Sequence, residues 1–361
     1  MKEIRKKIDQ IDTQISSLLD ERAKLVKQIG IKKQKDNEPV FAPHREKKII
    51  ERLSGESDNE EGFPVQAKMN IFSEIFAASR SMQEKLTVTY LGPEATYTHL
   101  AATRQFSDYC NYSPSSSIAQ VFREVEKQRA NYGVVPVENS TEGIVSHTLD
   151  MFIDSDCKIC AELLMEISHN LVSKEKELSK IRTVYSHPQA LSQCGIWLEE
   201  NLPHADYIEV SSTSKAALKA ANKKGTAAIS SSMAAKLYDL NILAERIENY
   251  KENVTRFFVI GNEITKPSGE DKTTIMFSIK DRVGALHDIL VPFKKNNINL
   301  TKIESRPSRM KAWEYIFFVD FEGHISEQVV NKALDELKGN CVFIKVLGSY
   351  PKARKLYEKS E

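Results

Sequence analysis

Thr255 and Arg256 stand at the start of an apolar run formed by residues 257–260. The β-branched and aromatic residues of this run predict a buried strand, so a rigid element holds a hydroxyl and a guanidinium. Such a pair suits a small anionic ligand, because the hydroxyl can donate a proton and the guanidinium can bind an acid group. Side chains alternate between the two faces of a strand. We therefore assign the chemistry to Thr255. We expect Arg256 to have a structural role or to contact the residues that bind the ligand.

Other strands predicted in the central part of the chain also end in polar residues. These strands cover residues 87–91, 132–137, 183–185 and 226–229. In α/β sheets, ligands collect at the carboxyl ends of strands, where Asn139 and Ser186 stand. Each polar cluster has a purely structural alternative, since Ser212-Thr213-Ser214 can cap a helix and His169 or His187 can be a core or cap residue.

The first 35 residues predict a long amphipathic helix over about residues 2–35. Its apolar positions alternate in spacing between four and three, and one position is an arginine: Ile4, Ile8, Ile11, Ile15, Leu18, Arg22, Leu25 and Ile29. This heptad seam is typical of a helix that packs against a partner. The helix would be roughly 50 Å long, too long for a small segment to bury by itself, so we expect a homodimer or a higher homo-oligomer.

Basic residues of this helix indicate an anionic ligand. Arg22 can be a polar residue that sets coiled-coil register, but Lys33 returns to nearly the same helix face eleven positions later. Arg5 lies off the seam and could reach a shared pocket only from a partner helix. Two further helices, over about residues 43–53 and 65–84, add Arg45 with Glu46, and Ser79 with Gln83 at i, i+4.

Composition limits the classes of protein that fit. The 361 residues are enough for two or three domains, and 51 basic against 50 acidic residues predict neither a nucleic-acid nor a membrane surface. The start of the sequence lacks a signal peptide, no apolar run is long enough to span a bilayer, and the five scattered cysteines fit a reducing compartment. We therefore expect a cytoplasmic protein. No Walker, Rossmann or HExxH motif occurs, and the single CxxC at residues 157–160 has no second pair, so we expect no cofactor and no metal.

The helical segment resembles the all-helical chorismate mutases. The resemblance implies that seven residues bind the substrate: Arg5 from the other subunit, Arg22, Lys33, Arg45, Glu46, Ser79 and Gln83. Among these, Lys33 and Gln83 would stabilise the ether oxygen of the bond that breaks. The reaction is a pericyclic rearrangement, which requires only a compact conformer and stabilised charge. Ala42 stands where the best-known members have an aspartate.

The central segment resembles the prephenate dehydratases. The matching motifs span residues 90–93, 135–140, 186–189, 193–194, 212–214 and 255–257. The resemblance implies two α/β subdomains with a cleft between them, similar to periplasmic binding proteins. It also implies that Thr255 donates to the departing ring hydroxyl of prephenate. Substrate-orienting roles pass to Asn139, Ser186, Gln193, Ser212 and Thr213. Ala95 and Tyr97 replace the glycine and phenylalanine usual in the first motif.

The last segment predicts the element order β-α-β-β-α-β, which is the ferredoxin-like plan. It resembles the ACT regulatory module. In related dehydratases the two motifs found here bind phenylalanine between subunits, which implies an effector site at Gly284, Ala285, Leu286, Glu304, Ser305 and Arg306. Amides at a helix start suit a carboxylate, and Glu304 can serve an ammonium. His287 replaces a common valine, and a packing module without ligand is the alternative.

Together these segments predict a multidomain protein: an all-α domain over 1–85, an α/β domain of two subdomains over 86–264, and an α+β ferredoxin-like domain over 272–361. The leading hypothesis is a bifunctional enzyme that makes prephenate from chorismate and converts it to phenylpyruvate, with feedback inhibition by phenylalanine. Alternatives are a dehydratase with a helical dimerisation scaffold, an arogenate dehydratase, and a non-catalytic amino-acid sensor.

Overall fold

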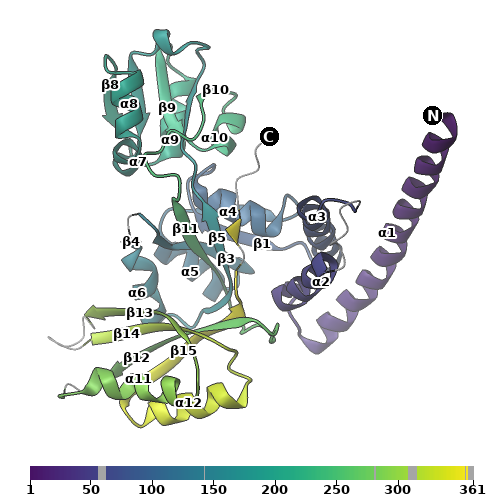
Figure 1. Ribbon diagram of the computed structural model, residues 1–361, viewed down its shortest axis with the longest axis vertical. Coiled ribbons are helices and arrows are strands. Elements are labelled where there is room, and N and C mark those ends of the chain that lie inside the picture. Colours follow the sequence, from purple (N-terminus) through teal and green to yellow (C-terminus); the bar gives the residue numbers. More distant parts are fainter. Residues whose placement is uncertain (56–61, 142, 280–281, 308–314, 354, 357–361) are drawn as a thin grey trace. The chain divides into compact units, whose positions relative to one another are not determined.

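The computed structural model describes residues 1–55, 62–141, 143–279, 282–307, 315–353 and 355–356 (Figure 1). These residues form two compact units. One unit contains residues 1–87 together with 106–111, and the other contains residues 88–105 and 112–361. In the described ranges, no helix combines the length and the apolar character that crossing a membrane requires.

The helical unit is built from α1 (Lys2–Asp36), α2 (Pro43–Gly55) and α3 (Val65–Gln83). Helix α3 packs against both other helices and buries Phe76 and Ala77. At Gly30, α1 and α3 approach so closely that an added Cβ would lie 2.8 Å from the Cγ of Gln83. Val26 is the buried apolar residue of α1. The heptad seam therefore remains on the surface of the single chain, with exposed fractions from 50% to 63% at Ile4, Ile8, Ile11, Ile15, Leu18, Leu25 and Ile29.

The second unit contains two α/β subdomains, each built on one sheet, and a C-terminal module. The first sheet has the order β16-β5-β11-β3-β1-β2, with β4 on β3. Its strands are β1 (Thr87–Leu91), β2 (Asn111–Ser115), β3 (Tyr132–Asn139), β4 (Gly143–Ile144), β5 (Lys158–Glu166), β11 (Val254–Gly261) and β16 (Lys355–Leu356). Its helices are α4 (Tyr97–Phe106), α5 (Ile118–Glu126) and α6 (Ser146–Asp154). Strand β11 is antiparallel to both β3 and β5, so the strand predicted for residues 257–260 is buried at the centre.

The second sheet has the order β10-β6-β9-β7-β8. Its strands are β6 (Asn170–Ser173), β7 (Thr183–Ser186), β8 (Asp206–Glu209), β9 (Thr226–Ser230) and β10 (Asn241–Ala244). It also carries a short 3₁₀ helix at Leu178–Lys180 and the helices α7 (Pro188–Gln193), α8 (Gly195–Asn201), α9 (Thr213–Ala221) and α10 (Ser232–Leu237). The chain enters this sheet through residues 167–169 and leaves it through residues 245–253. The predicted division into two α/β subdomains is thereby confirmed.

Backbone hydrogen bonds tie the two connections together. The amide of Ile247 donates to the carbonyl of His169 at 2.9 Å, and the amide of Ile167 donates to the carbonyl of Asn253 at 2.8 Å. The two connections therefore form a paired hinge between the sheets.

The C-terminal module consists of β12 (Asp271–Ile279), α11 (Ala285–Lys295), β13 (Leu300–Pro307), β14 (Tyr315–Glu322), α12 (Gln328–Lys338) and β15 (Cys341–Pro351). Its sheet order, β13-β14-β12-β15, confirms the ferredoxin-like plan. Helices α11 and α12 cover one face (Figure 1). The other face contributes Met276, Phe318 and Leu347 to a core shared with the first sheet.

We expect Gly348→Ala to lower the free energy of unfolding by about 1–3 kcal/mol, because β15 touches β5 at this glycine. An added Cβ would lie 2.3 Å from the carbonyl oxygen of Ile159 and 2.9 Å from its amide nitrogen. Scanning calorimetry would measure the change. The control is Gly339→Ala, where φ is −62° and the nearest atom would be 3.6 Å away, so stability should be kept. Equal melting temperatures for both variants would contradict the close contact.

Candidate active sites

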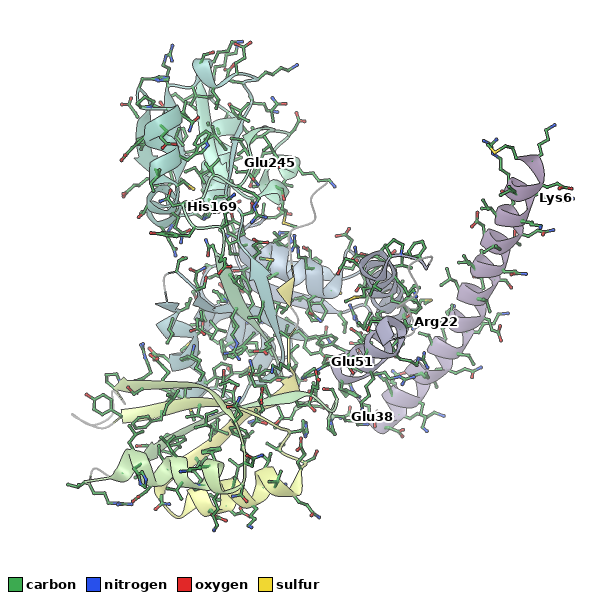
Figure 2. All side chains as sticks on the ribbon, viewed as in Figure 1. Lys6, Arg22, Glu38, Glu51, His169 and Glu245 are labelled. Carbon is green, nitrogen blue, oxygen red and sulfur yellow. The ribbon has the colours of Figure 1, made fainter. Side chains whose placement is uncertain are left out.

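Arg22, Ser79 and Gln83 lie together where α1 meets α3. The guanidinium of Arg22 donates to the Ser79 hydroxyl, and the Gln83 side-chain amide donates to the Ser79 carbonyl at 3.1 Å. Burial lowers the pKa of Arg22, and the nearby carboxylate of Glu46 opposes this shift. Figure 2 shows Arg22 on α1. A partly desolvated guanidinium beside a hydroxyl and an amide can bind a carboxylate ligand.

The other predicted residues of this unit have different surroundings. Lys33 donates to the carbonyls of Pro39 and Val40, at 2.9 and 3.0 Å, so the connection between α1 and α2 holds its ammonium. Arg5 and Arg45 are exposed. Arg5 is 17 positions from Arg22, or about 25 Å along one helix, so the two cannot serve one pocket within a single chain.

Arg80 is a buried residue that the sequence reasoning missed. It forms an ion pair with Glu46. Its guanidinium also lies 5.5 Å from the ring centre of Phe41 and 5.8 Å from that of Phe106. Glu46 is thus already neutralised by an internal partner.

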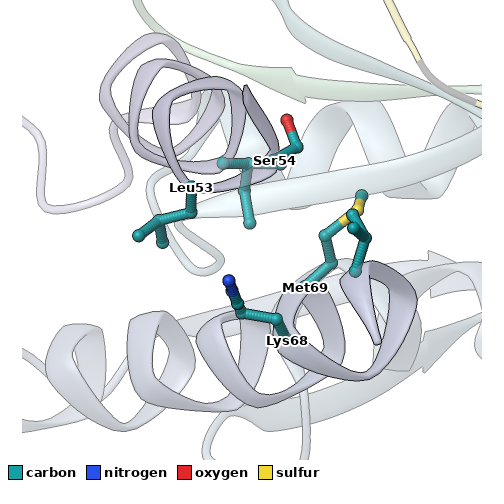
Figure 3. A pocket seen from close by; sticks show the side chains of 6 residues that line it. Leu53, Ser54, Lys68 and Met69 are labelled. Atoms are coloured by element: carbon teal, nitrogen blue, oxygen red, sulfur yellow. The ribbon is translucent and has the colours of Figure 1, made fainter. Parts of the chain in front are cut away.

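A small hollow between α2 and α3 contains none of the predicted residues (Figure 3). It is lined by Ile50, Leu53, Ser54, Val65, Lys68 and Met69. Its lining is mostly apolar, with one ammonium group. We therefore place no chemistry there.

In the second unit, a hydrogen-bonded network surrounds Thr255, where β3 ends and β11 begins. Thr255 and Asn139 are partners in the strand register. The backbone amide of Thr141, which can only donate, lies 3.0 Å from Oδ1 of Asn139. Nδ2 of Asn139 therefore faces Oγ1 of Thr255, at 2.8 Å. Because the Thr255 oxygen accepts this bond, its own hydrogen is directed elsewhere, as a donor to a ligand requires.

The network continues from β3 to the second sheet. The Thr141 hydroxyl lies 2.6 Å from Oδ1 of Asn139, and Nε2 of Gln193 lies 3.1 Å from the Thr141 hydroxyl. Oε1 of Gln193 in turn lies 2.8 Å from Nε2 of His169. Three predicted site residues, Thr255, Asn139 and Gln193, are therefore joined by hydrogen bonds across both subdomains.

Ser186, Ser212 and Thr213 stand at the carboxyl ends of the second sheet, where their contacts are internal. The Ser186 hydroxyl donates to the Ile229 carbonyl at 2.9 Å. Ser212 caps α9 by accepting from the amide of Lys215 at 3.1 Å, and Thr213 begins that helix. The N-cap interpretation of Ser212 is thus confirmed. His187 likewise caps α7.

The sequence reasoning missed four members of the network, which are Tyr97, Thr141, His169 and Asn253. His169 is 3% exposed, and burial lowers its pKa so that the imidazole is neutral near pH 7. The Tyr97 hydroxyl lies 2.9 Å from Nδ1 of His169. A signal existed for Tyr97, because a hydroxyl there departs from the usual phenylalanine. Ala95, which replaces a glycine, has a φ of 60°, so the backbone keeps the left-handed conformation that glycine favours.

Arg256 lies on the opposite face of β11 from Thr255 and is fully paired. Its guanidinium contacts Glu162 at 2.6 Å, Asp320 at 2.5 Å and the Tyr350 hydroxyl at 3.1 Å. It also stacks over the ring of Phe258. Arg256 therefore joins the first sheet to the C-terminal module, and the structural interpretation of this residue is confirmed.

The two motifs predicted to bind an effector lie at α11 and β13. Gly284 has a φ of 79°, Ala285 is buried, and Leu286 is 47% exposed. On β13, Glu304 and Arg306 are half-buried and alternate with the exposed Ser305.

Two ion pairs link β13 to the first sheet and α6. Nζ of Lys302 lies 2.5 Å from Glu138, the neighbour of Asn139. Nε of Arg306 lies 3.5 Å from Asp150. The strand that carries the second motif is thus in contact with the end of β3.

The described residues contain no group of three or more side chains that could hold a metal ion. The CxxC cysteines, Cys157 and Cys160, are both free thiols. Burial raises the pKa of Cys157 to about 11 and that of Cys160 to about 12. Thiols with such high pKa values are poor nucleophiles and poor ligands.

Comparisons with known proteins match all three segments. Residues 4–84 match the family model described as chorismate mutase type II, residues 88–265 match prephenate dehydratase, and residues 273–339 match the ACT domain. Bifunctional chorismate mutase/prephenate dehydratases from Aquifex aeolicus and Pseudomonas aeruginosa are 51% and 43% identical, over 98% of each chain. A crystal structure of prephenate dehydratase in complex with L-Phe, from Arthrobacter aurescens, is 34% identical with a TM-score of 0.68 and covers 74% of this chain and 90% of that one.

Proposed function

Since the chain belongs to the bifunctional chorismate mutase/prephenate dehydratase family, we propose that it converts chorismate to prephenate and then prephenate to phenylpyruvate, under feedback inhibition by phenylalanine. The observation that carries this proposal is the presence of both polar sites in one chain. We assign the mutase to residues 1–85, the dehydratase to residues 86–264 and the regulatory module to residues 272–361.

In the mutase, the helical unit holds chorismate in a compact conformer while one C–O bond breaks and one C–C bond forms. Arg22, with Ser79, binds a carboxylate, and Lys33 and Gln83 stabilise charge at the ether oxygen. Oε1 of Gln83 is buried without a hydrogen-bond partner in the described part of the chain. This unpaired oxygen leaves the buried amide short of one partner, which supports a ligand-binding role for Gln83. Arg45 and Glu46 line the same site, and Arg5 reaches it from a partner subunit.

In the dehydratase, Thr255 donates to the ring hydroxyl of prephenate. The bond to the ring carboxylate breaks and releases carbon dioxide, and its electrons enter the ring and make it aromatic. The ring C–O bond breaks with its electrons leaving on the hydroxyl, which takes the donated proton and departs as water. Asn139 and Gln193 orient the dianionic substrate. Ser186, Ser212 and Thr213 orient it from the second sheet.

Phenylalanine is proposed to bind at the ACT module through Gly284, Ala285 and Leu286 of one motif and Glu304, Ser305 and Arg306 of the other. The L-Phe complex of the Arthrobacter relative supports this effector. The exposed seam of α1 supports a homodimer, because seven apolar side chains on one helix need a covering surface. We also propose that the enzyme acts in the cytoplasm.

The decisive test offers chorismate to the purified protein and measures its loss together with phenylpyruvate formation, with and without phenylalanine. We expect both steps to proceed and phenylalanine to suppress the second. Unchanged chorismate with rapid turnover of added prephenate would show instead a dehydratase with a helical scaffold. Faster turnover of arogenate than of prephenate would change the assigned substrate.

We expect Arg22→Ala to lower mutase kcat/KM by about a hundredfold, because loss of a charge-assisted bond to a desolvated carboxylate costs roughly 3 kcal/mol. Dehydratase activity on added prephenate should not change, since it uses the other unit. The control is Lys24→Ala, which removes an exposed cation from the same helix. A folded Arg22→Ala enzyme with normal mutase activity would return Arg22 to a role in helix register.

A further inference from the structure

His169 is a buried imidazole in the hinge between the two α/β sheets, and the chemistry described so far does not use it. It closes the first connection, residues 167–169, and Figure 2 shows it beside the second sheet. Its backbone amide donates to the carboxylate of Glu248, in the second connection, at 2.9 Å. Its ring contacts Tyr97 of α4 and Gln193 of α7. One side chain therefore meets both subdomains.

The contacts assign a single hydrogen to the ring, at Nε2. Oε1 of Gln193 can only accept a hydrogen bond, and it lies 2.8 Å from Nε2 of His169. Nδ1 then carries no hydrogen, and the Tyr97 hydroxyl lies 2.9 Å from it. The single hydrogen of that hydroxyl is donated to the carbonyl of Ser168 at 2.7 Å. The tautomer is therefore assigned from Gln193 and not from Tyr97.

This hydrogen fixes the orientation of the Gln193 side chain. Oε1 of Gln193 accepts from His169 and also from Nδ2 of Asn253, at 3.2 Å. With the oxygen held on this side, Nε2 faces the Thr141 hydroxyl, which is 3.1 Å away. Without the imidazole hydrogen, only the longer bond from Asn253 would hold the oxygen on this side, and the amide would exchange its oxygen and nitrogen more readily.

The orientation matters because the ligand is a dianion. Nε2 of Gln193, Nδ2 of Asn139 and the Thr255 hydroxyl all supply hydrogens on the same branch of the network. A reversed Gln193 would place a carbonyl oxygen there, repelling a carboxylate and competing for the Thr141 hydrogen that now lies on Asn139.

We propose that His169 is a positioning residue of the dehydratase, which holds the Gln193 amide with its nitrogen toward the Thr255 branch. This inference rests on the proposed dehydratase function. His169 thus contributes to substrate recognition indirectly, through the orientation of the Gln193 amide.

The test is a double-mutant cycle on dehydratase activity with added prephenate. His169→Phe keeps a ring and removes both nitrogens, and we expect dehydratase kcat/KM to fall about a hundredfold. His169→Gln can place an amide nitrogen where Nε2 lies and should stay within about tenfold of wild type. In a Gln193→Ala background, His169→Phe should change the rate less than about threefold, because the side chain that it orients is gone. His204→Phe, at an exposed histidine outside the network, is the control.

His169→Leu keeps the test decisive where His169→Phe fails to fold, because leucine is smaller than phenylalanine and also lacks a hydrogen-bond donor. It should lower kcat/KM about tenfold or more with Gln193 present, and by less than about threefold in the Gln193→Ala background. Equal losses in both backgrounds would show that His169 only stabilises the fold, and would overturn the inference. Absence of dehydratase activity in the wild-type protein would instead refute the proposed function.

Discussion

Thr255→Ala is expected to lower the dehydratase kcat by about a hundredfold to a thousandfold while the mutase rate stays the same. The Thr255 oxygen accepts a hydrogen bond from Asn139 at 2.8 Å, so its hydrogen is available to the departing hydroxyl. Alanine removes that donor without adding bulk on β11. Stopped assays of phenylpyruvate from prephenate, and of prephenate from chorismate, would measure the two rates in one preparation.

Thr255→Ser is the matched control because it keeps the hydroxyl and removes only a methyl group. We expect it to retain activity within about tenfold of wild type, since serine rotates more freely than the β-branched threonine. An alanine variant as active as the serine variant would remove Thr255 from the mechanism. A rise in KM with kcat unchanged would assign it to binding alone.

Arg256→Met should lower the free energy of unfolding by about 3–5 kcal/mol, the cost of leaving buried charges without their partner. Glu162 and Asp320 are both buried and both form ion pairs with Arg256. Glu162 also contacts Lys272 at 2.8 Å. The midpoint of denaturant unfolding would show the loss. Arg256→Lys, which keeps one charge but not the planar fork, should lose less.

The same cluster predicts how acid acts on the protein. Burial alone would raise the pKa of Glu162, but the attraction of Arg256 and Lys272 is greater, and the pKa is lower than usual. Its stabilising contribution is therefore complete above the ordinary glutamate pKa and is lost as the pH falls through the lowered value. In Arg256→Met the loss should begin at higher pH. An unchanged acid limit would contradict this assignment of the charge.

The local sequence pattern was sufficient to predict the helices and strands and one part of the site around Thr255. The apolar run after Thr255 predicted its strand, and alternation separated Thr255 from Arg256. The partners of Arg256 could not be predicted, because Asp320 lies 64 positions away on another sheet. His169 was open to a core interpretation, since only the paired hinge connections bring it to Gln193. Arg80 shows the same limit, because no periodicity marks a buried arginine between two aromatic rings.

The contacts of strand β13 imply that effector and substrate each influence the binding of the other. This strand carries one of the two motifs that we propose bind phenylalanine, and its Lys302 is paired with Glu138, which precedes Asn139 in the chain. A coupling free energy between two binding sites is reciprocal, so any factor by which phenylalanine weakens prephenate binding must also apply to phenylalanine when prephenate is bound. The amount of phenylalanine that halts its own synthesis would therefore rise with the supply of precursor. The degree of inhibition would depend on the ratio of product to precursor rather than on the product concentration alone.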